Sequence, residues 1–356
     1  MPTGPPTNLL AWAWKLRRRR KEFRASIADR RQIETNIFDV SEALERTKIE
    51  SPMTDSRLKD RVLGCLLGGA LGDAWGGPWE GKPGPVQFVV PTRPMLSDDT
   101  ELTLATCESI IDECLVEPES LARHFVRWFN ARRIHGVGSS TLKALRDLSA
   151  GTHWALAGAR GEYAAGNGAA MRIAPLAFLL DPNDPRQRTI IRDACRITHH
   201  SDEAYVGALA VIFAIRAVFT QEWTPQRSFL SCVVRCLPDS AVRDRMLQLM
   251  PLELPIEEVG HRFGTTGYVV DTVPFALYCA QRIVEHPLDV TLARTISAGG
   301  DTDTTASITG QLAGTVVGLA GVPQEMFAQV ERGGQVLSIA HTFANFVEQT
   351  DPKTNG

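Results

Sequence analysis

The sequence predicts a single all-α domain, and three observations lead to that fold class. Apolar residues recur at spacings of three and four almost everywhere between Leu58 and about Gln349, as they do on one face of a helix. Strand-like alternation is scarce, and its best example, residues 86–90, is short. A hydrophobic content of 44% and a charged content of 22% are ordinary for a soluble globular protein. We therefore expect a compact multi-helix domain over residues 56–350.

Residues 1–55 differ from the rest and are expected to form an N-terminal extension outside that domain. They hold Trp12 and Trp14, followed by a basic run over 15–21. One interpretation is a poorly ordered tail, or a translation start assigned too far upstream, because Met53 stands just before the first strongly periodic element. The other is an arm that engages a partner protein, a nucleic acid or an anionic surface. Two tryptophans beside a basic run favour an interface.

Two of the expected helices carry glycine at every fourth position. These are Gly64, Gly68 and Gly72 in the first helix, and Gly310, Gly314 and Gly318 in the last strongly periodic one. Glycine inside a helix costs roughly 1 kcal/mol against alanine, so a reason is needed. We infer that the two helices pack closely in the core and hold polar loops together at their ends. Ordinary tight packing without such a pair is the alternative.

The apolar period predicts helices, in order, over 101–115, 120–130, 139–149, 187–198, 203–219, 227–236, 272–284 and 304–319. Seven cysteines, an odd number set mostly in apolar segments, favour reduced and buried thiols in a cytoplasmic protein. No stretch reaches the roughly 18 uninterrupted apolar residues of a membrane helix. The net charge of -3 gives no reason to expect nucleic-acid binding by the whole protein.

Two acidic clusters carry the chemistry: residues 97–100 read SDDT, and residues 301–304 read DTDT. Simple helix capping explains one residue of the first cluster but not two adjacent aspartates with flanking hydroxyls. Clustered carboxylates repel one another unless a cation lies between them. Oxygen-only ligands suit magnesium, manganese or calcium better than zinc. The pattern therefore predicts one divalent-metal site, built from both ends of the domain, and hence an enzyme.

The second cluster also resembles the nucleophile loop of haloacid-dehalogenase-type phosphatases. That loop follows a buried hydrophobic strand near the start of its domain. Here Ser-Ala-Gly-Gly at 297–300 precedes the cluster, and only about fifty residues follow it. The context therefore does not favour a phosphatase.

Other motifs add candidate substrate contacts. Residues 166–172, GNGAAMR, form a glycine-rich turn that is expected to open a helix and expose N–H groups to a phosphate. His199 and His200 follow a predicted helix, where a histidine can serve the helix dipole or contact a substrate. Residues 264–268, GTTGY, form a polar loop that can wall the site with Tyr268. Asp73 and Glu80 add two carboxylates near the end of the first helix.

Taken in order, these motifs resemble the ADP-ribosylglycohydrolase family, which includes dinitrogenase reductase-activating glycohydrolases and ADP-ribosylarginine hydrolases. The resemblance covers about residues 57–346 and rests on segments 60–74, 97–100, 166–172, 198–199 and 299–304. It implies an all-α fold and a pair of Mg²⁺ or Mn²⁺ ions. It also implies hydrolysis of the bond between C1″ of the distal ribose and an acceptor atom.

Residue by residue, the resemblance implies the following roles. Metal ligands would be Ser97, Asp98, Asp99, Asp301, Asp303 and Thr304, with Ser97 standing where many members have threonine. Residues around ADP-ribose would be Gly166, Asn167, Gly168, Met171 and His199, with Tyr268 in the neighbouring loop. The catalytic residues would be Asp98 or Glu80, taking a proton from water, and Asp303 at the metal site.

We therefore expect a metal-dependent hydrolase that removes ADP-ribose from modified protein side chains, arginine first, through an N-glycosidic or possibly an O-glycosidic bond. Its partner would be an ADP-ribosylated protein. The alternative is an immunity-type protein that binds and blocks an ADP-ribosylating toxin through residues 1–55, with Trp12, Trp14 and the basic run as contacts. The two roles can coexist.

Overall fold

The fold is that of a computed structural model, which describes residues 56–161 and 164–350. The predicted extension, residues 1–55, lies outside these. The all-α prediction is confirmed, because helices form most of the described chain and strands form almost none of it. The sheet found among the described residues is one parallel pair of two-residue strands, β1 (Ala159–Arg160) and β2 (His199–His200).

The longer helices follow the predicted order, and every predicted helical segment lies over an observed one. They are α2 (Ser56–Gly76), α3 (Asp98–Glu113), α4 (Pro118–Asn130), α5 (Ser139–Ser149), α8 (Pro185–Arg196), α9 (Asp202–Phe219), α11 (Ala241–Leu249), α12 (Ile256–Phe263), α13 (Val269–Ala280), α14 (Leu288–Ser297), α15 (Thr302–Val317) and α17 (Gly333–Thr350).

Short helices connect them. Those of α type are α6 (Trp154–Ala157), α7 (Ala174–Ala177), α10 (Phe229–Val233) and α16 (Gln324–Phe327). Turns of 3-10 helix are η2 (Gly77–Trp79), η4 (Asn167–Ala169), η5 (Val234–Cys236), η6 (Gln281–Val284) and η7 (Leu319–Gly321).

Residues 86–90, the best strand candidate, do not form a strand. Val86 donates its N–H to Ser297 O at 2.8 Å, but no ladder follows. Val89 and Val90 are 62% and 40% exposed, so the alternation reflects no buried sheet face. A strand needs a neighbour to pair with, and this segment crosses the outside of a helical domain.

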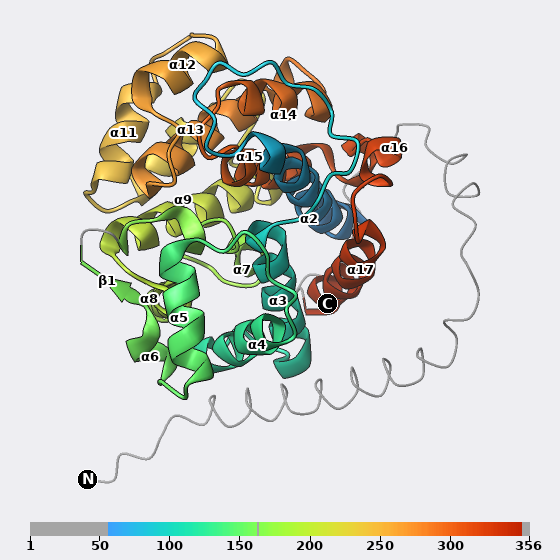
Figure 1. Ribbon diagram of the computed structural model, residues 1–356. Helices are drawn as coiled ribbons and strands as arrows, with labels where there is room; N and C mark the ends of the chain where they lie inside the picture. Colours follow the sequence, from blue (N-terminus) through green and yellow to red (C-terminus); the bar gives the residue numbers. More distant parts are fainter. Residues whose placement is uncertain (1–55, 162–163, 351–356) are drawn as a thin grey trace.

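Helices α2 and α15 form an antiparallel pair at the centre, and Figure 1 shows α2 beside α15, with α17 next to them. Their glycines meet backbone to backbone. A Cβ atom on Gly68 would lie 2.4 Å from Gly310 O, and one on Gly72 would lie 2.1 Å from Ala306 O. These approaches are too close for any side chain, so the inferred glycine pairing is confirmed.

The same pairing sets the end of α2 against the start of α15. Thr302 Oγ1 donates to Gly76 O at 2.8 Å, across 226 positions of sequence. Beyond α2 the chain stays beside that start, because Lys82 and Gly300 pair as an antiparallel bridge. Polar residues from both ends of the domain are therefore held together by the packing of one helix pair.

The thiol and membrane predictions can also be compared with the structure. All seven cysteines are free, and six of them are buried. Within residues 56–161 and 164–350, no helix has the length and apolar character needed to cross a membrane.

Candidate metal and substrate site

The two predicted acidic clusters meet where two helices begin. Asp98 and Asp99 stand in the first turn of α3, and Asp303 stands in the first turn of α15. Thr304 Oγ1 donates to Asp99 Oδ2 at 3.1 Å, which joins the clusters directly across 205 positions. The positive ends of both helix dipoles point at these carboxylates and stabilise their charge in part.

Ser97 prepares the first cluster by capping α3. Its Oγ accepts the Asp99 N–H at 3.3 Å. Asp73, near the end of α2, accepts the N–H groups of Ser97 and Thr100 at 3.1 and 3.2 Å, together with the Thr100 hydroxyl. Burial raises the pKa of Asp73 to about 6 despite these hydrogen bonds. Asp73 therefore anchors α3 against α2, a role that the sequence did not reveal.

The carboxylates repel one another. Burial raises the pKa of Asp98, Asp99 and Asp303 well above the ordinary value, and neighbouring aspartates raise each of them further. For Asp99 the strongest neighbour is Asp303, and for Asp303 it is Asp301. A backbone hydrogen bond from Gly138 to Asp98 opposes the effect only in part. Among the described residues, no positive side chain is a leading influence on the pKa values of Asp98, Asp99 and Asp303.

The chemistry of this cluster fits a hard divalent cation. Asp99 Oδ1 is buried and has no hydrogen-bond partner in the described chain, so it is free to bind an ion. The donors are carboxylate and hydroxyl oxygens, the set that suits Mg²⁺ or Mn²⁺. Among the described residues, no three His, Cys, Asp or Glu side chains converge as a formed metal site. The proposed ligand set therefore also relies on the hydroxyls of Ser97 and Thr304.

Glu80 lies at the exposed rim of the cluster. The bridge between Lys82 and Gly300 holds it there, with Gly81 N–H donating to Gly300 O at 2.8 Å. Partial burial and the nearby charge of Asp301 raise the pKa of Glu80. A carboxylate at the rim is placed where it could exchange a proton with a bound water.

The predicted substrate loop lies against the same cluster. Asn167 Nδ2 donates to Asp301 Oδ2 at 2.7 Å and to Thr272 Oγ1 at 3.0 Å. Gly166 pairs with Tyr268 as an antiparallel bridge, and Tyr268 is 44% exposed. The glycine-rich turn, the polar loop and the second acidic cluster are thus connected by direct hydrogen bonds.

Two expectations about this loop need correction or refinement. No long helix follows the turn, because η4 has three residues and α7 has four, so no extended helix dipole faces a phosphate there. Pro175 stands in the first turn of α7 and cannot donate a backbone hydrogen bond to the preceding turn, so η4 and α7 do not join into one helix. Met171 is only 3% exposed, and its carbonyl accepts from Gln311 Nε2 at 2.7 Å. Met171 therefore supports the loop from behind.

His199 and His200 occupy different surroundings. His199 is buried, and a Cβ atom on Gly166 would lie 3.2 Å from His199 Nε2. Burial and the charge of Arg172 lower the pKa of His199 to about 3, so its ring is neutral. His200 is half-buried and lies against Gly158 instead. The structure brings His199, and not His200, to the glycine-rich turn.

Sequence reasoning missed a second buried carboxylate beside the cluster. Glu101, whose side chain is 1% exposed, accepts from His135 Nδ1 at 2.8 Å and from Arg332. It ties the loop after α4 to the start of α17. No periodic signal could have found this contact, because Glu101 and Arg332 are 231 positions apart.

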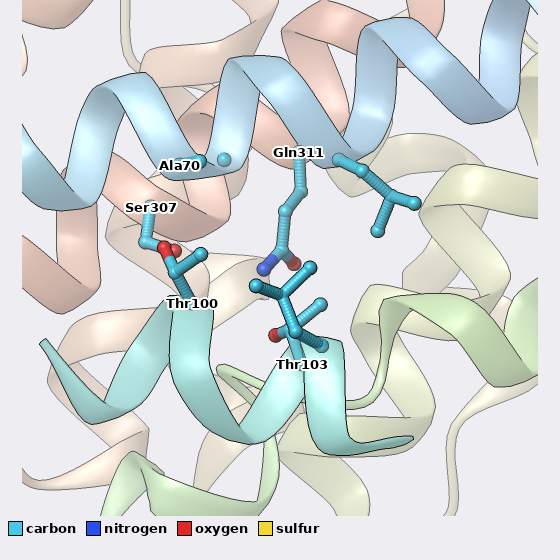
Figure 2. A pocket seen from close by; sticks show the side chains of 8 residues that line it. Ala70, Thr100, Thr103, Ser307 and Gln311 are labelled. Atoms are coloured by element: carbon cyan, nitrogen blue, oxygen red, sulfur yellow. The ribbon is translucent and has the colours of Figure 1, made fainter. Parts of the chain in front are cut away.

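A small cavity of about 10 Å³ lies directly behind the acidic cluster, between α2, α3 and α15. Figure 2 shows Ser307 and Gln311 pointing toward Thr100 and Thr103 across it. Ser307 Oγ and Gln311 Oε1 have no hydrogen-bond partner among the described residues. The space is on the order of one water molecule, so the back of the site is closed to anything larger.

A larger pocket of about 230 Å³ lies elsewhere, beside α10 and α13. Its walls include Met250, Tyr278 and Arg282. None of the predicted site residues lines it, so the sequence-predicted chemistry and this pocket are separate features.

Comparisons with known proteins identify the family of the chain. A family model described as ADP-ribosylglycohydrolase matches residues 54–353. ADP-ribosylhydrolase ARH3 of Mus musculus is 27% identical over 263 residues, covering 64% of this chain and 71% of ARH3. ADP-ribosylarginine hydrolase Tri1 of Pseudomonas putida is 26% identical over 265 residues, covering 72% of this chain and 67% of Tri1.

A solved structure, described as an ADP-ribosylglycohydrolase-related protein complex, shares the fold. Its TM-score is 0.59 at 24% identity, over 82% of this chain and 99% of that one. The family model spans nearly all of the domain predicted from the sequence, which confirms the resemblance and the enzyme class drawn from it. The chain belongs to the ADP-ribosylglycohydrolase family.

Proposed function

We propose that this protein removes ADP-ribose from modified protein side chains, with arginine as the preferred acceptor and divalent metal as the cofactor. The observation that carries the proposal is the meeting of α3 and α15, which puts unneutralised carboxylates beside the glycine-rich turn. Arginine is preferred because Tri1, similar over 72% of this chain, is an ADP-ribosylarginine hydrolase.

The cation ligands in this proposal are Ser97, Asp98, Asp99, Asp301, Asp303 and Thr304. Two Mg²⁺ or Mn²⁺ ions bound there would supply Lewis-acid stabilisation of ribose oxygens and lower the pKa of an attacking water. Asn167 donates a 2.7 Å hydrogen bond to Asp301, so the substrate loop would help to orient one member of the ligand set.

Proton transfer belongs to carboxylates of the chain. Glu80 at the rim, or Asp98 at the start of α3, takes the proton of the water that attacks C1″. The bond from C1″ to the acceptor breaks through an oxocarbenium-like transition state, as in other glycosides. The hydroxyl of the water stays on C1″, and the proton taken up by the carboxylate passes to the departing acceptor side chain, so that free ADP-ribose and the unmodified side chain are released. Burial of Asp98 and partial burial of Glu80 raise both pKa values toward the range such transfer needs.

The test measures release of ADP-ribose from a protein modified on arginine, with Mg²⁺ or with EDTA, and from a second protein modified on serine. We expect metal-dependent release from arginine. Release from the serine-modified protein alone would show that serine, and not arginine, is the acceptor. Release that is unchanged by EDTA would contradict the proposed metal dependence.

Asp303→Ala is expected to lower the rate by at least about 100-fold, because it removes a carboxylate shared by the cluster. Asp244→Ala, at an exposed position on α11, is the matched control and should keep the rate of the wild type. Full activity of D303A would contradict the two-metal assignment.

A further inference from the structure

We infer that Arg172 and Thr198 act as positioning residues that fix His199 as an Nε2–H hydrogen-bond donor toward bound ADP-ribose. The inference rests on the proposed function for the identity of the ligand. Its structural part concerns a chain of hydrogen bonds from Arg172 through Thr198 to His199. The argument depends on which of their atoms can donate and which can accept.

The chain of hydrogen bonds begins at a buried guanidinium. Arg172 is 3% exposed and donates to Thr198 Oγ1 at 2.7 Å, as well as to the carbonyls of Gly168 and Ala194. It also stands over the ring of Phe125, 5.1 Å from its centroid. Ala194 lies in the last turn of α8, where the helix dipole is negative and favours a cation. These contacts hold the guanidinium in one place.

An arginine has only donors, so Thr198 Oγ1 must accept from it. The remaining neighbour of this hydroxyl is His199 Nδ1, at 2.7 Å. Thr198 is fully buried, and no carbonyl of the described chain accepts its proton. Were Nδ1 protonated, the hydroxyl hydrogen would be buried without an acceptor, which is unfavourable. The hydroxyl therefore donates to Nδ1.

A neutral imidazole whose Nδ1 accepts carries its hydrogen on Nε2. The positive charge of Arg172 and the burial of the ring both keep His199 neutral, and its pKa is lowered to about 3. The ring is thus a donor at one nitrogen and cannot serve as a general base through Nδ1.

The donor edge faces the glycine-rich turn. A Cβ atom on Gly168 would lie 2.8 Å from His199 Cε1 and 3.3 Å from Nε2, so only glycine fits against that edge. Nε2 has no hydrogen-bond partner among the described residues. A ligand oxygen lying on this turn would therefore meet a hydrogen that is already oriented toward it, which reduces the entropy lost on binding.

The first measurement is the tautomer of His199 in the full-length wild-type protein without ligand. Long-range ¹H–¹⁵N NMR distinguishes protonated from unprotonated ring nitrogens, and a His199→Asn protein assigns the signals by their loss. We expect an unprotonated Nδ1 and a protonated Nε2 from pH 5.5 to 8. A protonated Nδ1 would overturn the inference.

The second measurement compares Thr198→Val with Thr198→Ser. Valine keeps the shape and removes the hydroxyl, while serine keeps the hydroxyl. We expect T198V to lose the single tautomer and to bind ADP-ribose about tenfold more weakly by calorimetry, a difference of about 1.4 kcal/mol. T198S should retain the wild-type tautomer and affinity, and its binding curve controls for damage to the fold.

The two measurements separate the inference from the proposed function. The tautomer of His199 is measured without ligand. A wild-type protein that fails to bind ADP-ribose would therefore count against the proposed function, while the spectra would still test whether Arg172 and Thr198 fix the tautomer. A T198V protein with the wild-type tautomer would contradict the inference that Thr198 fixes the tautomer of His199. So would equal affinity of wild type and T198V for ADP-ribose.

Discussion

At the scale of residues, the acidic cluster places function and stability in opposition. Asp99 is 1% exposed, one of its oxygens has no partner, and its nearest charges are other aspartates. Such a group destabilises the metal-free fold whenever it is ionised, because its pKa is raised on folding. A divalent ion bound there, as the proposed function requires, would remove that penalty.

This opposition predicts the behaviour of Asp99→Asn in EDTA. A raised folded pKa contributes stability that is present below the unfolded value, near 3.8, and is lost as pH rises through the folded value. Asparagine does not ionise, so the D99N protein does not lose stability at this position as the pH rises. At pH 7.5 we expect the free energy of unfolding of D99N to exceed that of the wild type by about 1 kcal/mol or more. The reason is that each unit of pKa difference between the folded and unfolded states is worth about 1.4 kcal/mol.

The measurement is chemical denaturation at pH 7.5 and again near pH 4, where the difference should close. Asp244→Asn, on an exposed surface, is the control and should match the wild type at both values. Added Mg²⁺ should stabilise the wild type and leave D99N little changed. A D99N protein no more stable than wild type at pH 7.5 would show that the cluster is not strained.

The sequence was informative about residues where several chemical groups fall within one short segment. SDDT and DTDT predicted acidic residues that the fold brings together. The contacts of Asp73, Arg172 and Glu101 were not predicted, although Asp73 and Arg172 stood in predicted motifs. Each of the three acts through a partner far along the chain or through a backbone group. Such pairs leave no local pattern, so only the folded arrangement reveals them.

At the scale of elements, the α2–α15 pair determines where the site forms. Each helix is buried on most sides, and the contact between them is made by backbone atoms. The glycine stripes were the sequence signal for this, since their cost in helix propensity requires compensation by close packing. The strand prediction for residues 86–90 was wrong, because a local alternation of apolar residues forms a strand only where a partner strand is available for pairing.

Gly68→Ala is expected to destabilise the protein by about 2 kcal/mol or more, because its Cβ atom would lie 2.4 Å from Gly310 O. Gly334→Ala is the matched control in α17, where a Cβ atom would meet nothing within 4 Å. That change should be neutral or stabilising by about 0.5 kcal/mol. Thermal or chemical unfolding checks both, and equal stability of G68A and G334A would contradict the close helix contact.

At the scale of the whole molecule, the residues of the site all belong to the helical domain. Removing residues 1–52 is therefore expected to leave the rate of ADP-ribose release within about twofold of the full chain, since no described site residue is lost. The check is the release assay on the two proteins, at equal concentration and matched Mg²⁺. A loss of more than about tenfold would assign the extension a part in catalysis.

The antiparallel pairing of α2 with α15 also bears on how the protein is made. The halves of the acidic cluster are separated by 205 positions, so they meet only after a very long loop has closed. Contacts of such sequence separation slow folding. During synthesis α2 emerges early, with its glycine face uncovered until α15 follows. A chain that is unfinished or truncated before α15 cannot assemble the acidic cluster. Under the proposed function such a chain would be inactive.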